Sequence, residues 1–210
     1  MSLGTRATRG AIWTIASSMG ARMIGLIGTL YMTHLLDKDV IGEVAAAWVL
    51  AQTANWLSHW GFNQYLVVRG PDGPEQTYHA AMLHVGFGVV GLATIALTGG
   101  LFSSVFNAPH LARYVPGLAL AVLIRRLGAV ADKILVREMR FRELAVANGL
   151  GELAFTLCAV TLAATTTLGG LSIVIANVVQ ATLTTALILR ATGLGWLQRS
   201  PWRWQRVREI

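Results

Sequence analysis

The sequence is poor in charge and almost free of cysteine. Charged residues make up 13% of its 210 residues, whereas soluble globular domains carry roughly 25% charge. Hydrophobic residues make up 54%, so too few polar side chains are present to cover the surface of a soluble fold. The same composition excludes disordered and collagen-like chains. Cys158 is the single cysteine, which excludes a disulfide-stapled secreted domain. An integral membrane protein remains.

Six apolar stretches are each long enough to cross a bilayer as a helix, which takes about 20 residues. Short polar segments with turn-forming residues separate them, as at residues 70–74 and 107–109. We therefore predict an all-α integral membrane protein with six transmembrane helices. The predicted spans are residues 10–36, 41–62, 77–97, 111–131, 144–165 and 170–189.

Acidic residues are scarcer than basic ones, and the chain carries a net charge of +7. The basic residues fall mainly on one side of the predicted spans, which marks that side as cytoplasmic. Both termini are then predicted to be cytoplasmic. The positive charge is explained by the orientation of the protein in the membrane and by contact with anionic lipids, so binding of nucleic acid is not predicted. The residues on this side are Arg6, Arg9, Arg69, Lys133, Arg137, Arg140, Arg142, Arg199, Arg203, Arg206 and Arg208, against Lys38 and Arg113 on the other.

Two charged segments lie outside the predicted spans. Residues 132–143 form a cytoplasmic linker, and residues 190–210 form a basic cytoplasmic tail. In the stretch 134–144, arginines alternate with apolar residues such as Met139 and Phe141. This mixture predicts a short amphipathic helix on the inner leaflet.

Polar side chains inside four of the spans lie near mid-depth, where lipid-facing surfaces admit only apolar groups. In the first span, Ser17, Ala21, Gly25 and Thr29 form a ridge of small residues that favours close helix packing. Arg22 lies beside this ridge. The candidates for the lining of a polar cavity are Arg22, Gln52, Asn55, His59, Arg125, Arg126, Asn148, Glu152, Asn177 and Gln180.

These polar groups have two interpretations. The amides and hydroxyls can hydrogen-bond one another inside a dry bundle, which stabilises it by about 0.6–2 kcal/mol for each bond. A charge at the bilayer centre costs at least about 2.5–3.5 kcal/mol, so Arg22 and Glu152 either pair with each other or line a water-filled cavity. Arg125 and Arg126 either extend their charges to the cytoplasmic headgroups or enlarge a cationic patch in that cavity.

No enzyme site, metal site or cofactor site is indicated. The segment from Gly86 to Gly91 fits the dinucleotide fingerprint but lies inside a predicted span, with no strand before it, so helix packing explains its glycines. The five histidines lack metal-ligand spacing. No pair of carboxylates, Cys/His pair or serine triad appears.

Three segments read THLLDKDVIG at residues 33–42, GFNQYLVVR at residues 61–69 and ILVREMRFR at residues 134–142. In order and spacing they resemble segments of the polysaccharide and O-antigen flippases, the Wzx-type transporters of the multidrug/oligosaccharidyl-lipid/polysaccharide exporter superfamily. The junction at residues 33–42 is similar to that family's pattern of a small residue followed by x-Leu-Leu-x-x-x-x-aromatic/aliphatic-Gly. Residues 61–69 are similar to its Gly-x-x-x-x-Leu-Val-Gln-Arg segment, and residues 134–142 to its basic inner loop. The resemblance covers nearly the whole chain.

The resemblance implies a bacterial inner-membrane protein that moves a lipid-linked oligosaccharide outward by alternating access. Such transporters have two six-helix lobes in a MATE-like arrangement, and this chain corresponds to the N-terminal lobe. A second copy or a separate chain would supply the other lobe, or the chain is a truncated product that does not transport. Arg22, Arg125 and Arg126 are then candidates to bind the pyrophosphate of a polyprenyl-linked glycan. The residues for its sugars are Gln52, Asn55, Asn177 and Gln180.

Two further hypotheses remain open. The first is a cation-coupled antiporter of the same superfamily that exports drugs or other small molecules, with Glu152 as the coupling group. The second is a membrane scaffold that assembles glycan-synthesis enzymes and transports nothing.

Overall fold

The computed structural model describes residues 19, 20, 22–58, 74–193 and 195. Within these residues the regular elements are all helices, so the described part is all-α, as predicted. A first helix covers residues 22–35. It is followed by α2 (Lys38–Leu57), α4 (Pro74–Thr98), η1 (Gly99–Phe102), α5 (Leu111–Arg137), α6 (Phe141–Thr165) and α7 (Leu171–Thr192).

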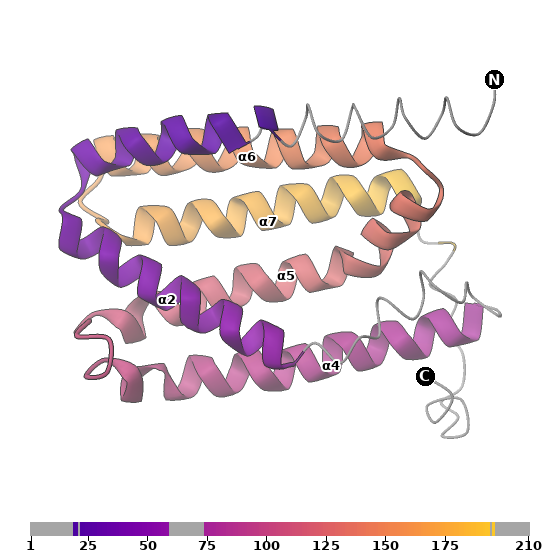
Figure 1. Cartoon of the computed structure of the whole chain (residues 1–210), viewed down its shortest axis with the longest axis horizontal. Coiled ribbons are helices and arrows are strands. Elements are labelled where there is room, and N and C mark those ends of the chain that lie inside the picture. The colour runs from indigo at the N-terminus through magenta and orange to yellow at the C-terminus, as the bar shows by residue number, and fades with distance from the viewer. Residues whose placement is uncertain (1–18, 21, 59–73, 194, 196–210) are drawn as a thin grey trace.

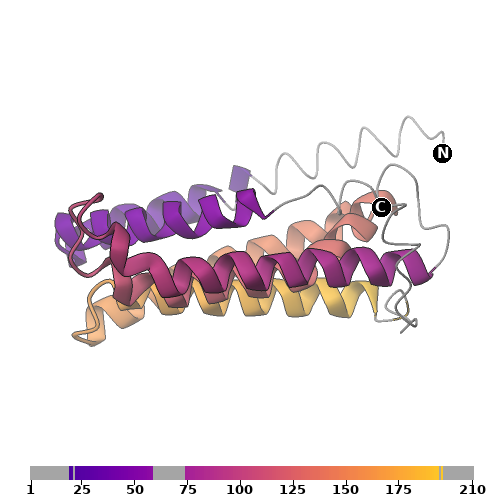
Figure 2. The ribbon, with the colours of Figure 1, turned by 90° about the horizontal axis from the view of Figure 1, so that it is seen from below.

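The helices run back and forth along the long axis of the molecule (Figure 1). The turns at residues 36–37, 99–110 and 166–170 lie at one end, and the turn at residues 138–140 lies at the other (Figures 1 and 2). Successive helices therefore alternate in direction. The side-by-side order is α6, α7, α5 and then the pair α2 and α4, each packed on the next.

The largest apolar core joins α2, α4 and α5. Leu50 of α2, Leu92 of α4 and Leu118 of α5 are each no more than 6% exposed and belong to one cluster. Val174 joins this cluster from α7. This core fixes α2 on the α4/α5 side of the bundle.

The first helix packs instead on α6, and glycines allow the close approach. A Cβ atom at Gly28 would lie 2.7 Å from Cγ2 of Thr156, and one at Gly25 would lie 3.3 Å from Oε2 of Glu152. Met32 continues the same face and is buried. Thr29 is exposed, so the packing face follows residues 25, 28 and 32 rather than the four-residue ridge predicted from the sequence. Ser17 and Ala21 lie outside the described residues.

The separate amphipathic helix predicted over residues 134–144 does not form. Instead, α5 continues to Arg137, and α6 begins at Phe141. Met139 adopts a φ of 56°, and the backbone N–H groups of Met139 and Arg140 donate to the carbonyls of Val136 and Leu135. This pattern is a Schellman cap, which ends one helix abruptly and redirects the chain into the next.

Three helices in the described part are long and apolar enough to cross a membrane, by length and composition alone. They are Ala81–Phe102, Phe141–Thr165 and Leu171–Thr192. Together with the composition, they support a membrane protein. The central arginines of α5 and the polar side chains of α2 lower the hydropathy of those helices. The full set of six spans stays a prediction.

We predict that Gly28→Ala destabilises the protein, whereas Gly20→Ala on the same helix does not. The added methyl group at Gly28 meets Thr156, and overpacking of this kind costs about 1–3 kcal/mol. Nothing lies within 4 Å of a Cβ at Gly20, and alanine there gains helix propensity. Thermal unfolding of both variants in detergent measures the difference. Equal unfolding temperatures for the two variants would contradict close packing of the first helix on α6.

Candidate functional site

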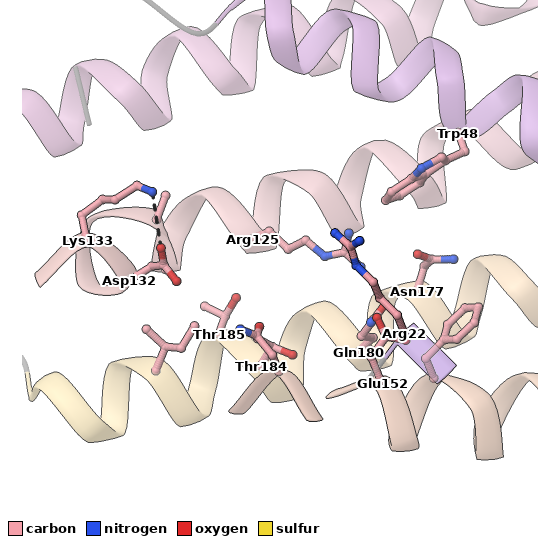
Figure 3. Close-up of a pocket in the computed structure, with 15 residues that line it drawn as sticks. Arg22, Trp48, Arg125, Asp132, Lys133, Glu152, Asn177, Gln180, Thr184 and Thr185 are labelled. Atoms are coloured by element: carbon pink, nitrogen blue, oxygen red, sulfur yellow. Dashed lines mark hydrogen bonds and ion pairs between the residues drawn. The ribbon is translucent and has the colours of Figure 1, made fainter. Parts of the chain in front are cut away.

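A polar cleft of about 720 Å³ opens in the middle of the bundle (Figure 3). Its walls carry both signs of charge together with amides, hydroxyls and one tryptophan. The polar and aromatic residues that line it are Arg22, Trp48, Arg125, Asp132, Lys133, Asn148, Glu152, Phe155, Asn177, Gln180, Thr184 and Thr185.

The cleft follows from the packing of the two N-terminal helices on different neighbours. The first helix, with Arg22, lies along α6, whereas α2, with Trp48, lies along α4 and α5. The two helices meet at residues 36–37 and then diverge (Figure 1). The cleft lies between them, and α5, α6 and α7 supply the rest of its lining.

Arg125 of α5 is held at the centre of the cleft by two neighbouring helices. Its Nη2 donates a hydrogen bond of 2.7 Å to Oε1 of Gln180 on α7. Its guanidinium carbon lies 5.2 Å from the ring centroid of Trp48 on α2, a cation–π contact. These contacts orient the cation but leave other N–H donors of the guanidinium for a ligand.

Arg22 and Glu152 both line the cleft. Among the described residues no ion pair within 4.0 Å joins them, so the salt bridge considered from the sequence is not formed. The Glu152 carboxylate lies against the backbone of Gly25 and attracts the Arg125 guanidinium. The cleft therefore contains two arginines and one carboxylate that no direct ion pair neutralises.

The amides on α7 keep part of their hydrogen-bonding capacity. Asn177 donates through Nδ2 to the carbonyl of Ile173, 3.0 Å away. Gln180 accepts from Arg125 through Oε1, which leaves its NH2 group as a donor. The cleft thus offers both donors and acceptors to a hydroxyl-rich ligand.

Arg126, the next residue along α5, lies outside the cleft in the interface with α2 and α4 and is 4% exposed. Its guanidinium donates to Oδ1 and the backbone oxygen of Asn55, both at 2.7 Å. It also donates to Oγ of Ser58 at 2.6 Å and to the carbonyl of His84 at 2.8 Å. Asn55 and Ser58 lie at the end of α2, where helix carbonyls lack partners, so the cation caps that helix.

Gly88 of α4 makes room for this arginine. A Cβ atom there would lie 2.5 Å from Cδ of Arg126, and one at Gly91 would lie 3.1 Å from Cβ of Ser58. At Gly86 a Cβ would meet nothing within 4 Å. Two of the three glycines of the apparent dinucleotide fingerprint therefore serve helix packing, as expected from their place in the sequence.

The structure brings together six of the ten residues proposed from the sequence, namely Arg22, Arg125, Asn148, Glu152, Asn177 and Gln180. Gln52 and Asn55 lie on α2, outside the lining, and Arg126 is buried. His59 lies outside the described residues. Whether the six bind a substrate stays a prediction.

Sequence reasoning missed Asp132, Lys133 and Thr185 as cleft residues. The first two were placed in a cytoplasmic linker, but α5 continues through them and they form an ion pair of 3.7 Å. A signal was present, because residues 125, 129 and 132 recur at helical spacing and share one face of α5. In the described part of the chain, no group of three or more His, Cys, Asp or Glu side chains is arranged to hold a metal ion.

An all-helical bundle with candidate membrane spans and a charged cleft between its helices defines a polytopic membrane protein with an internal polar site. The chain matches over residues 31–210 the family described as "Polysaccharide biosynthesis protein". It belongs to this family, and the resemblance to polysaccharide flippases seen in the sequence is confirmed.

Two curated relatives are similar to the chain at low identity. The chain is 24% identical over 160 residues to the lipopolysaccharide biosynthesis protein WzxC of Escherichia coli (strain K12). It is 22% identical over 156 residues to the succinoglycan biosynthesis transport protein ExoT of Rhizobium meliloti (strain 1021). The matches cover 76% and 74% of this chain but 32% of each relative, so the chain spans about a third of their length. No solved structure matches the chain.

We predict that Arg126→Met destabilises the protein far more than Arg125→Met. The first change leaves the buried acceptors of Asn55, Ser58 and His84 without their donor, at a cost of about 3 kcal/mol or more. The second removes a side chain that faces the cleft, where water can replace it, at a cost of about 1 kcal/mol or less. Chemical denaturation in detergent compares the two. Similar losses of stability would contradict the assignment of Arg126 to the helix interface.

Proposed function

We propose that the chain is part of a flippase that moves a lipid-linked oligosaccharide across the bacterial inner membrane during surface polysaccharide biosynthesis. The observation that carries this proposal is the convergence of charged and amide side chains from four helices on one cleft, with Trp48 added from α2. The family and the names of the two relatives, one of them a transport protein, support transport of polysaccharide material over enzymatic chemistry.

The two cleft arginines are suited to the anionic end of such a substrate. A guanidinium binds phosphate oxygens through paired N–H donors, and these charge-assisted bonds are stronger than neutral ones. Arg125 is already oriented by Gln180 and Trp48. Arg22 faces it from the first helix (Figure 3). We propose that the pyrophosphate of a polyprenyl-linked glycan binds between these two groups.

The remaining lining is suited to sugars. Asn148, Asn177 and Gln180 offer amide donors and acceptors for hydroxyl groups, and the ring of Trp48 provides an apolar face for a pyranose. A glycan headgroup cannot cross hydrocarbon without partners for its polar groups. The cleft would replace its hydration shell while the lipid tail stays in the bilayer.

We propose that a second set of helices faces the cleft, from a second copy of the chain or from a separate chain. The cleft is bounded by Arg22 on one diverging helix and Trp48 on the other, so a partner lobe would close it on the open side. Parallel repeats about an axis along the membrane normal would give both lobes the same orientation. Alternating access would then consist of movement of one lobe against the other.

A cation-coupled antiporter for small molecules is the second candidate, and the unpaired carboxylate of Glu152 favours it. A carboxylate in a membrane cleft can alternate between a bound cation and a substrate. A scaffold without transport activity is the third, and the charged cleft does not favour it.

We predict that Arg125→Gln and Arg22→Gln each reduce glycan export at least tenfold, because each removes a charge-assisted contact worth about 1.5–3 kcal/mol. The measurement is surface polysaccharide in a deletion strain complemented with each variant, normalised to the amount of protein in the membrane. Arg113→Gln, an exposed position at the opposite end from residues 138–140, is the charge-matched control and should restore export fully. Full export by both cleft variants would contradict the proposal that these arginines bind the substrate, and it would favour the scaffold hypothesis.

We predict that Glu152→Gln separates the two transport candidates. If the substrate is a lipid-linked glycan held by arginines, the neutral amide retains measurable export. In a cation-coupled antiporter the same change abolishes the response to proton and sodium gradients. Uptake into inverted membrane vesicles with imposed gradients provides the measurement. Transport that requires a gradient and is lost in Glu152→Gln would favour the antiporter.

A further inference from the structure

A second concave surface, which we call the basic groove, lies at the end of the bundle that holds the turn at residues 138–140. It is about 560 Å³ in volume and runs between the start of α6 and the end of α7. Arg140, Arg142 and Arg190 provide its positive charge, Glu143 adds one carboxylate, and Met139, Val146 and Leu187 are among its apolar walls. It does not share a lining residue with the cleft.

The groove lies where two candidate membrane spans leave the hydrocarbon. Phe141 begins the first of these helices and Thr192 ends the second. The two are antiparallel neighbours, so these ends lie together (Figure 1). A surface between the ends of two spans is at the depth of the lipid headgroups.

Arg140 forms a fixed end of the groove. Its Nε and Nη2 donate to the two carboxylate oxygens of Glu143 at 2.9 and 2.5 Å, and its Nη1 donates to Glu138 at 3.0 Å. Nη2 also donates to the carbonyl of Ala191 at 2.7 Å, which ties the turn to the end of α7. The hydrogen bonds to Glu143 and then to Glu138 raise the pKa of Arg140 above its ordinary value. This arginine stays charged and is largely neutralised.

In the described ranges, Arg142 and Arg190, unlike Arg140, are not neutralised by neighbouring carboxylates. Both are exposed, and neither makes a side-chain hydrogen bond or ion pair within the described part of the chain. They lie on α6 and α7, on the two walls of the groove. Their charges therefore remain available to an anion.

We propose that the basic groove binds the headgroup of an anionic phospholipid of the surrounding membrane. Arg142 and Arg190 contact the phosphate, and the acyl chains lie along Val146 and Leu187. Basic pockets between transmembrane helices at the cytoplasmic side bind such headgroups. The apolar walls select a lipid over free phosphate, because a soluble anion gains nothing from them. This site is independent of the transport proposal, since it shares no lining residue with the cleft.

The test is native mass spectrometry of the purified full chain in detergent, titrated with phosphatidylglycerol or with phosphatidylcholine. We expect phosphatidylglycerol to bind at least tenfold more tightly. Arg142→Gln and Arg190→Gln should each weaken it about fivefold, because one arginine near a lipid surface contributes about that factor. Arg137→Gln, an exposed arginine at the same end but outside the groove, is the matched control and should leave the affinity unchanged.

Two further variants separate charge, apolar contact and folding. Arg142→Lys keeps the charge and should retain binding, and Val146→Ser removes an exposed apolar contact and should weaken phosphatidylglycerol binding about threefold. An excess of inorganic phosphate should leave the lipid bound. Equal affinity for the two lipids, an equal loss in Arg137→Gln, or displacement by inorganic phosphate would each overturn the proposal.

Discussion

The contact between Arg126 and the end of α2 is the interaction on which the rest of the arrangement depends. An arginine buried among apolar helices must have its donors satisfied inside the protein, because no water reaches it. Here Asn55, Ser58 and His84 accept them, so α2 and α4 are joined to α5 near the middle of the bundle. With α2 held on this side and the first helix packed on α6, the space between them becomes the polar cleft.

Neighbouring positions on one helix have opposite roles in this bundle. Arg125 and Arg126 are separated by about 100° around α5, so one faces the cleft and the other faces α2 and α4. The same rule applies on α6, where Asn148 lines the cleft while Ala147 lines the basic groove. Each central helix therefore contributes to packing on one side and to a polar or basic surface on another.

Much of the fold and part of the candidate site could be predicted from the sequence. Composition indicated a membrane protein, and the regular spacing of Asn148, Glu152, Asn177 and Gln180 marked helix faces that do meet in one cleft. The separate helix over residues 134–144 was mispredicted, because the charged end of a long helix resembles a linker when only hydropathy is considered. The two adjacent arginines could not be assigned separately, because sequence spacing does not show which neighbour a helix face meets.

The sequence by itself determined that the chain forms apolar helices and that these helices carry polar side chains at regularly spaced positions. These properties depend only on composition and on the 3.6-residue period of a helix. Its short motifs were also enough to indicate the family. Only the tertiary structure decided that Arg125 faces the cleft while Arg126 is buried, that Gly25 and Gly28 bring the first helix onto α6, and that α5 extends to Arg137. The physical reason is that these outcomes depend on which helix packs on which, a choice made by contacts between residues far apart in the chain.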